Sequence, residues 1–309
     1  MPSGLRRASL SLRNAPGIPT ASSVFVAPGD VIEGVDMEEG FLRGHGTAVV
    51  NGRLTATLCG TVERVNKLVS VRPLRSRYSP ETGDVVLGRV TEIAGKRWKL
   101  DVNSRQDAIL QLSAVNLPGG IQRRRNAVDE LNMRQLYGEN DLVSAEVQNF
   151  YADGAVALHT RSLKYGRLSG GQLVRVMPTL IKRVKQHFHR LSAEQLRASS
   201  DVEILLGCNG FVWVGVPSTA TARDGEAAAA DGSDSVLRVG PEAREAICRV
   251  ANAVRALAAL FLAIHPPAIL DVYACSLEWG VSPKDMLGTG FLVRTLERES
   301  ERRIARGGA

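Results

Sequence analysis

The sequence predicts a multidomain protein that is mainly β, with an α/β unit at its C-terminal end. The 309 residues are enough for two or three small domains at about 100–200 residues per domain. Short β-type runs separated by turn residues fill the first half of the chain. A long amphipathic helical pattern appears only after Pro241. This order of patterns favours β units first and a mixed unit last.

The chain begins with a segment of low apolar content. Residues 1–22 are rich in Ser, Pro, Gly and Arg and contain no apolar run of signal-peptide length, so we expect a disordered tail. Residues 23–75 then carry five short β-type runs and should form a small N-terminal β domain. Asn51-Gly52 lies between two of these runs and predicts a two-residue hairpin, because both turn positions need a positive φ.

A second unit is expected over residues 79–165. It contains five β-type runs at fairly even spacing, namely 84–90, 98–102, 108–112, 142–150 and 155–159. A polar, partly helical insertion that includes Arg123, Arg124 and Arg125 separates the third run from the fourth. Five strands with one helical excursion are typical of an oligonucleotide-binding barrel, the OB fold.

The third unit is expected over residues 166–309 and should be mixed α/β. Two apolar runs, 202–206 and 211–214, are joined by a G-x-x-G loop, and they could be two strands or a strand and a helix. Residues 217–240 are of low complexity, as in a disordered insertion. Helical patterns then cover about 241–264, 269–279 and 291–306.

The positive charge of the chain is concentrated in one segment. The net charge is +7, yet residues 161–197 hold nine Lys and Arg against one acid, so this segment carries +8 and the remainder −1. A concentrated positive field is what a polyanionic partner selects.

Within this segment, Lys182, Arg183 and Lys185 alternate with apolar residues in a strand-like pattern. A run of cations is often only a solvated surface. Here it lies between the predicted barrel and the G-x-x-G loop, which favours sequence-independent contact with RNA phosphates.

The loop itself, Gly207-Cys208-Asn209-Gly210, admits two interpretations. In KH modules, such glycines let the backbone approach the phosphates of a bound single strand closely. Here the two central residues are neutral, so a structural role is equally open.

The sequence shows no pattern of a catalytic or metal site. The four cysteines form no C-x-x-C pair, and the five histidines form no H-E-x-x-H motif. His187 and His189 would share one face of a strand, as a metal pair or, more simply, as polar or RNA-facing side chains. We expect no enzyme activity, no cofactor, no metal and no membrane segment.

The chain also contains several longer motifs: V-x-P-G-D at 26–30, G-D-V-V-L-G-R-V at 83–90, W-K-L-D-V-N-S-R at 98–105, N-L-P-G-G at 116–120, L-H-T-R-S-L-K-Y-G at 158–166 and the G-x-N-G loop at 207–210. Together these motifs resemble one family, the S1/KH cap subunits of the eukaryotic RNA exosome of the ribosomal RNA-processing protein 4 type. The resemblance covers about residues 24–215 and the helix after 240. The insertion at 217–240 departs from the usual compact KH region.

The resemblance implies a non-catalytic RNA-binding subunit with an S1-type OB barrel and a KH-type domain. Such caps sit on a ring of subunits resembling phosphorolytic exoribonucleases, beside other S1/KH caps. They guide single-stranded RNA toward an associated 3′-to-5′ exonuclease for RNA degradation and rRNA processing, in the nucleus, the nucleolus and the cytoplasm. The candidate RNA-binding residues are the basic and aromatic side chains of the barrel together with the basic run: Arg89, Lys96, Arg97, Trp98, Arg105, Lys182, Arg183 and Lys185.

Two other functions remain open at this stage. A free-standing S1/KH regulatory protein acting on ribosomes or mRNA would share the RNA-binding features. An S1/KH-bearing nuclease is disfavoured, because the sequence has no clustered acidic motif.

Overall fold

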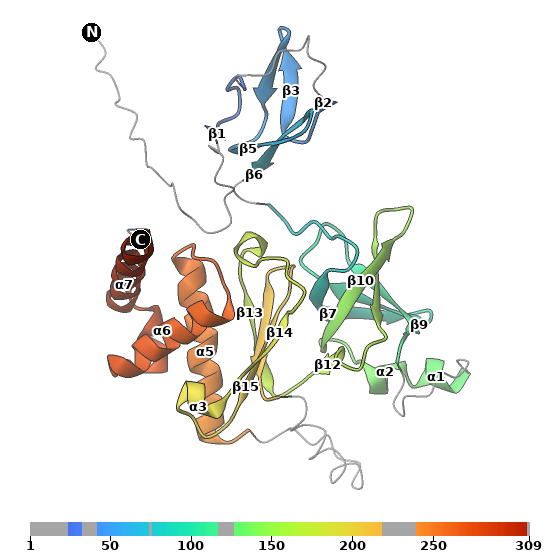
Figure 1. Cartoon of the computed structure of the whole chain (residues 1–309). Coiled ribbons are helices and arrows are strands. Elements are labelled where there is room, and N and C mark those ends of the chain that lie inside the picture. The colour runs from blue at the N-terminus through green and yellow to red at the C-terminus, as the bar shows by residue number, and fades with distance from the viewer. Residues whose placement is uncertain (1–23, 33–41, 74–75, 117–126, 218–238, 308–309) are drawn as a thin grey trace. The chain divides into compact units, whose positions relative to one another are not determined.

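A computed structural model describes residues 24–32, 42–73, 76–116, 127–217 and 239–307 (Figure 1). The expected tail at 1–22, the Arg123–Arg125 cluster and nearly all of the insertion at 217–240 lie outside the described residues. The chain divides into two compact units, Met1–Ser76 and Arg77–Ala309.

The N-terminal unit is built from short strands. One sheet has the order β1-β5-β6-β2, and β3 pairs with β4 in a separate hairpin. The strands are β1 (Phe25–Val26), β2 (Leu42–Arg43), β3 (Thr47–Val50), β4 (Arg53–Ala56), β5 (Gly60–Val65) and β6 (Leu68–Pro73). Asn51 and Gly52 both have positive φ, +51° and +73°, and Val50 pairs with Arg53. The hairpin expected at this dipeptide is confirmed.

A closed five-stranded barrel begins the larger unit. Its strands are β7 (Val85–Ala94), β8 (Arg97–Asp101), β9 (Ala108–Val115), β10 (Leu142–Phe150) and β11 (Val156–Thr160). The order β11-β9-β8-β7-β10 is closed by pairing of β10 with β11. The helical excursion lies between β9 and β10, as α1 (Ala127–Leu131) and α2 (Met133–Leu136). All five barrel strands expected from the sequence are confirmed.

A four-stranded antiparallel sheet follows, in the order β13-β16-β15-β14. Its strands are β13 (Gly171–Arg175), β14 (Phe188–Leu191), β15 (Val202–Leu206) and β16 (Phe211–Gly215). The runs on either side of the G-x-x-G loop are therefore two strands. A short strand, β12 (Gly166–Leu168), links the barrel to this sheet by pairing with β10.

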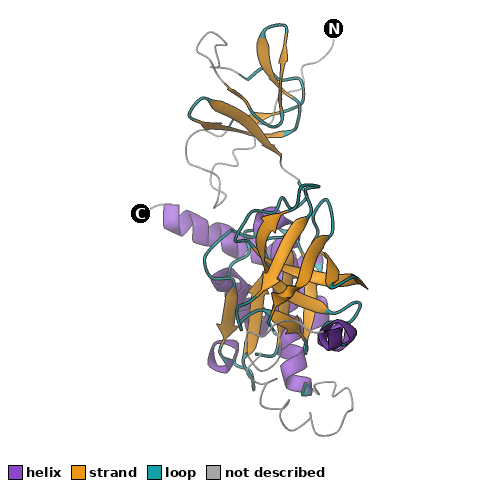
Figure 2. Ribbon diagram, turned by 90° about the vertical axis from the view of Figure 1, so that its right-hand side faces the viewer, coloured by secondary structure: helices purple, strands orange, loops and turns teal. Residues whose placement is uncertain are grey.

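Helices cover one face of this sheet (Figure 1). The helix that packs directly on the sheet is α5 (Pro241–Ala259), and α6 (Pro266–Glu278) and α7 (Thr289–Gly307) belong to the same helical layer, with the short elements η2 (Pro178–Leu180), α3 (Ala193–Leu196) and η3 (Pro283–Leu287). The three expected C-terminal helices are confirmed. Figure 2 shows most helices of this unit behind its strands.

The sheet is buried on both faces because its side chains alternate between two cores. Ile204, Val212 and Val214 pack with the helices in one core. Leu205 and Trp213 pack in another core, together with residues of the barrel strand β7. The sheet is therefore the middle layer between barrel and helices, the order seen from right to left in Figure 1.

The basic run before β14 does not form the strand that its alternation resembles. Residues 182–187 form no strand, although their alternation of cationic and apolar residues is strand-like. Ile181 is buried and makes a single bridge to Ile264, whereas Val184 is 49% exposed. The apolar residues of this run thus have different environments, and the alternation does not reflect one buried face. Among the described helices, none is long and apolar enough to cross a membrane.

Candidate nucleic-acid interface

The outer face of the barrel carries several of the candidate cations. Along β8, Trp98 and Leu100 are buried while Arg97 is exposed and Lys99 partly exposed, because successive side chains of a strand point to opposite faces. Arg105 is exposed on the loop after β8, and Arg89 on β7 is partly exposed. Arg97, Arg105 and Arg89 are therefore accessible to a phosphate backbone.

Lys96 precedes β8 in the turn that follows β7. Its Nζ atom lies 2.7 Å from Glu130 on α1, and its side chain is 66% exposed. An ion pair this exposed contributes little to stability, about 0–1 kcal/mol. Lys96 can therefore exchange Glu130 for a phosphate at small cost.

Trp98 is not a surface residue, and its expected contact with RNA is wrong. Its side chain is 0% exposed, its Nε1 atom donates to the carbonyl oxygen of Tyr137 at 3.0 Å, and its ring meets that of Tyr137 edge-on, with 5.3 Å between centroids. Burial of a large aromatic side chain with its N–H satisfied is core packing. Trp98 therefore packs the residue that follows α2, Tyr137, against the barrel.

The basic run after η2 divides into two kinds of residue. Lys182 and Lys185 are exposed, as an RNA contact requires. Arg183 instead pairs with Glu81 and lies 3.2 Å from Asp84, a carboxylate that is only 7% exposed. Asp84 also accepts from the Tyr78 hydroxyl at 2.6 Å. Arg183 therefore connects the segment before β14 to the segment that leads into the barrel strand β7.

The G-x-x-G loop is inserted against the barrel. Asn209 is 0% exposed, and its Nδ2 atom donates to the carbonyl oxygens of Leu87 at 2.7 Å and Val102 at 2.9 Å. The backbone N–H of Cys208 donates to Val85 at 2.9 Å. The loop thus satisfies polar backbone groups of the barrel, and the structural interpretation is the one that its burial favours.

The histidines next to this loop are not arranged as a pair on a strand. His187 precedes β14, is 5% exposed and bonds through Nδ1 to the Leu206 carbonyl at 2.7 Å. His189 lies within β14, where burial, and then the neighbouring His187, lower its pKa. No group of three or more potential metal ligands occurs in the described parts of the chain.

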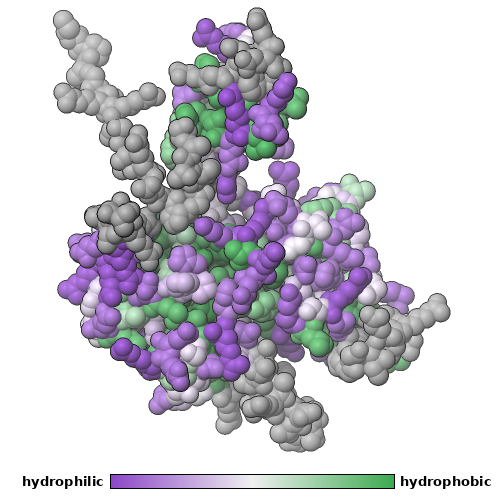
Figure 3. Space-filling view, viewed as in Figure 1, coloured by the Kyte–Doolittle hydropathy of each residue, from purple (hydrophilic) through white to green (hydrophobic). Residues whose placement is uncertain are grey.

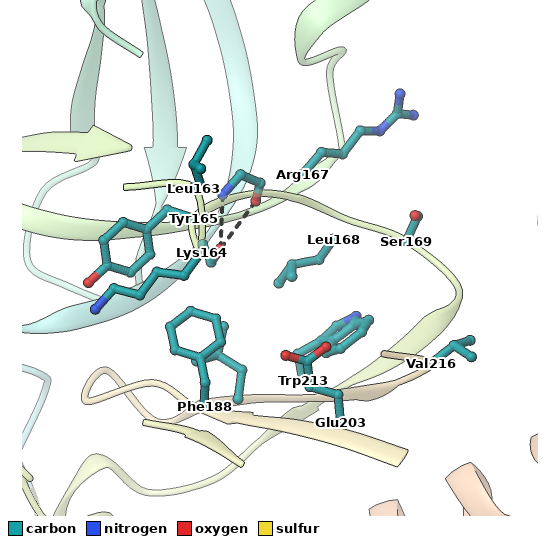
Figure 4. A pocket seen from close by; sticks show the side chains of 13 residues that line it. Leu163, Lys164, Tyr165, Arg167, Leu168, Ser169, Phe188, Glu203, Trp213 and Val216 are labelled. Carbon is teal, nitrogen blue, oxygen red and sulfur yellow. Dashed lines mark hydrogen bonds between the residues drawn. The ribbon is translucent and has the colours of Figure 1, made fainter. Parts of the chain in front are cut away.

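A cavity that the sequence did not predict lies between the barrel and the KH-type sheet (Figure 4). Lys164, Tyr165 and Arg167 line it from the segment around β12, and Phe188 and Trp213 from the sheet. The run L-H-T-R-S-L-K-Y-G at 158–166 gave a signal for the family. It gave no signal for a cavity, because Phe188 and Trp213 come from distant strands.

Comparison with known proteins agrees with this architecture. Three family models match: "Exosome complex exonuclease RRP4 N-terminal region" over residues 25–65, "RRP4, S1 domain" over 77–149 and "KH domain" over 171–220. A curated Arabidopsis thaliana protein named "Exosome complex component RRP4 homolog" is 45% identical over 279 residues, which are 87% of this chain and 84% of that protein.

The chain belongs to the RRP4 family of exosome components. The Bos taurus "Exosome complex component RRP4" is 45% identical and covers 85% of this chain and 84% of its own length. The Saccharomyces cerevisiae protein of that name is 38% identical and covers 84% of this chain and 78% of its own length. The resemblance inferred from the sequence motifs is confirmed, together with the S1 and KH domain types. In this RRP4-family chain, the candidate RNA-binding cations are distributed over the S1 barrel and the segment before β14.

Proposed function

We propose that this protein is a non-catalytic RNA-binding cap subunit of an exosome, which guides single-stranded RNA into a central channel for 3′-to-5′ degradation or processing. The observation that carries the proposal is the S1 barrel of an RRP4-family chain with accessible cations on its surface. Arg97 and Arg105 are exposed on the strand β8 and the loop after it. Lysine and arginine bind phosphates without reading sequence, and release of counterions favours the binding.

The hydropathy of the surface supports this function. The face of the larger unit seen in Figure 3 is mostly hydrophilic over the barrel, with scattered hydrophobic residues. A hydrophilic surface with exposed cations suits a strand that must slide, because phosphate contacts position the strand and carry no sequence information. A tight base-reading cleft would hold the strand in place.

The partners in this proposal are ring subunits resembling phosphorolytic exoribonucleases, other S1/KH caps and an associated 3′-to-5′ exonuclease. Exposed apolar residues on the N-terminal unit, among them Phe25, Leu42 and Val50, suit docking to such a neighbour. The proposal places the protein in the nucleus, with its nucleolus, and in the cytoplasm, where such complexes process and degrade RNA. It assigns no cofactor to the chain.

The test combines purification with an activity assay. The tagged protein should elute in a particle of several hundred kilodaltons together with ring subunits, and the isolated chain should bind single-stranded RNA without shortening it. RNA decay by the isolated chain that depends on metal or phosphate, and is lost on mutation of a site, would overturn the non-catalytic assignment. Elution as a monomer from native extract would favour the free-standing regulator.

A further inference from the structure

The cavity between the barrel and the KH-type sheet has a volume of about 170 Å³. Drug-sized ligands occupy cavities of about 300–1,000 Å³. This cavity therefore has room for one ring system or one side chain and not for a longer ligand. Figure 4 shows it bounded by the 163–169 segment on one side and by Phe188, Glu203 and Trp213 on the other.

The aromatic walls of the cavity are fixed in place. The Tyr165 hydroxyl donates to Glu146 at 2.7 Å, and the Tyr165 and Phe188 rings are tilted by 49° with 5.9 Å between centroids. The Trp213 indole lies so close to Gly171 and Gly215 that a Cβ atom at either glycine would come within 2.7 Å of its ring. Walls held in advance reduce the entropy lost on binding.

The charges around the cavity are of both signs. The Nζ atom of Lys164 lies 4.8 Å from the Tyr165 ring centroid and 6.0 Å from that of Phe188. Arg167 is half exposed and lies 3.1 Å from Asp141. On the side of the sheet, the partly buried Glu203 lines the cavity. An ionised carboxylate has room for about four donors on its two oxygens.

A nucleotide has the three chemical features that this arrangement complements. Its base has apolar faces that stack on aromatic side chains, its phosphate is an anion, and bases other than uracil carry an exocyclic amino group that donates to a carboxylate. Guanine has two adjacent donors, N1–H and the exocyclic amine, and so suits Glu203 best. A hydrophobic side chain of a partner protein would complement the rings of the cavity but not the charges of Lys164 and Glu203 beside them.

We propose that the cavity between β12 and the KH-type sheet binds a single unstacked base of single-stranded RNA, with guanine preferred over uracil. The base lies among Tyr165, Phe188 and Trp213, its amino edge faces Glu203, and its phosphate lies by Lys164. This site deepens the proposed RNA-binding function and rests on it. It gives the strand a second point of contact, apart from the exposed cations of the barrel.

The direct test measures the equilibrium binding of GMP and of UMP to the full chain, by calorimetry or by ligand-observed NMR. The proposal expects GMP to bind more tightly than UMP. Phe188→Leu keeps the apolar volume and removes the ring, and should weaken GMP binding about fivefold or more. Phe150→Leu, at a residue 42% exposed and outside the cavity lining, is the matched control and should change nothing. Equal binding of both nucleotides, or equal effects of both variants, would overturn the proposal.

A second test locates the occupant in the assembled complex. Leu163 is 89% exposed on the rim of the cavity, so Leu163→p-benzoylphenylalanine should not disturb folding. Irradiation should give an adduct with RNA that excess GMP suppresses and excess UMP suppresses less. An adduct with protein alone would assign the cavity to a partner peptide and overturn the proposal.

These outcomes separate the cavity from the broader function. If Lys182→Glu with Lys185→Glu weakens RNA binding while Phe188→Leu does not, the cavity proposal fails and the RNA-binding function stands. If the chain binds no single-stranded RNA at all, both fail.

Discussion

The side chain of Asn209, in the loop between β15 and β16, donates to the backbone carbonyl of Leu87, 122 residues earlier in the chain, at 2.7 Å. The Leu87 N–H lies 3.4 Å from the Asn209 Oδ1 atom, so one amide serves both polar groups of one barrel residue. A loop that resembles a phosphate-binding element is thereby part of the joint between barrel and KH-type sheet.

Replacing Asn209 should destabilise the larger unit. Asn209→Ala leaves the carbonyls of Leu87 and Val102 and the N–H of Leu87 buried with lost partners, which should cost about 2–4 kcal/mol of unfolding free energy. Chemical denaturation would measure this loss. Asn149→Ala, at an exposed residue of β10, should change stability by less than about 0.5 kcal/mol. Equal stabilities of the two variants would show that Asn209 does not stabilise the contact between the barrel and the KH-type sheet.

Gly215 should not tolerate a side chain. A Cβ atom there would lie 2.3 Å from the Trp213 ring, so Gly215→Ala must displace the indole. The expected cost is about 1–3 kcal/mol, as for other overpacked cores. Gly240→Ala is the control, because nothing lies within 4 Å of a Cβ atom at that position. Thermal unfolding should separate the two variants, and a wild-type midpoint for Gly215→Ala would contradict the packing described.

Mild acid should destabilise the protein through two histidines. Burial is the main factor that lowers the pKa values of His159 and His189 below the ordinary 6.5. The unfolded chain therefore binds more protons than the folded one below about pH 6.5, and stability falls as the pH falls from about 7.5 to 5. His189→Gln should flatten this dependence in denaturation experiments. A slope unchanged by the substitution would show that His189 does not contribute.

Arg183 and its neighbours should separate into two classes of variant. Arg183→Met removes the cation next to the buried Asp84 and should lower stability by about 1–3 kcal/mol, whereas Lys182→Met should leave stability unchanged. Lys182→Met should lower the affinity for RNA at low salt, because it removes an exposed cation. Denaturation and RNA titration of both variants would check this division; equal stabilities would contradict it.

Local patterns predicted much of the fold, because strand periodicity and turn chemistry depend on residues that are neighbours in the sequence. The Asn51-Gly52 hairpin and the five barrel strands are examples. Trp98 shows where such reasoning fails. Trp98 was a candidate RNA contact, yet strand alternation alone places it on the face opposite Arg97, and that face is the core. The run at 181–185 shows the limit of periodicity in the other direction, since alternation without a shared buried face does not form a strand.

The site was less predictable than the fold because it depends on contacts between distant segments. Whether the G-x-x-G loop faces solvent or protein is decided by Leu87 and Val102, and nothing near residue 207 indicates them. The cavity likewise combines Tyr165 with Phe188 and Trp213, which only the folding of the sheet onto the barrel brings together.

The central claim is that cations on the S1 barrel bind the RNA backbone, and the salt dependence of single-stranded RNA affinity tests it most directly. For the full chain, the logarithm of the affinity should fall linearly with the logarithm of the salt concentration. Each phosphate contact on a single strand should add about 0.7 to the steepness of this slope. Arg97→Gln with Arg105→Gln should reduce the slope by about 1.4 without changing stability. A slope equal to that of the unmodified chain would contradict the account.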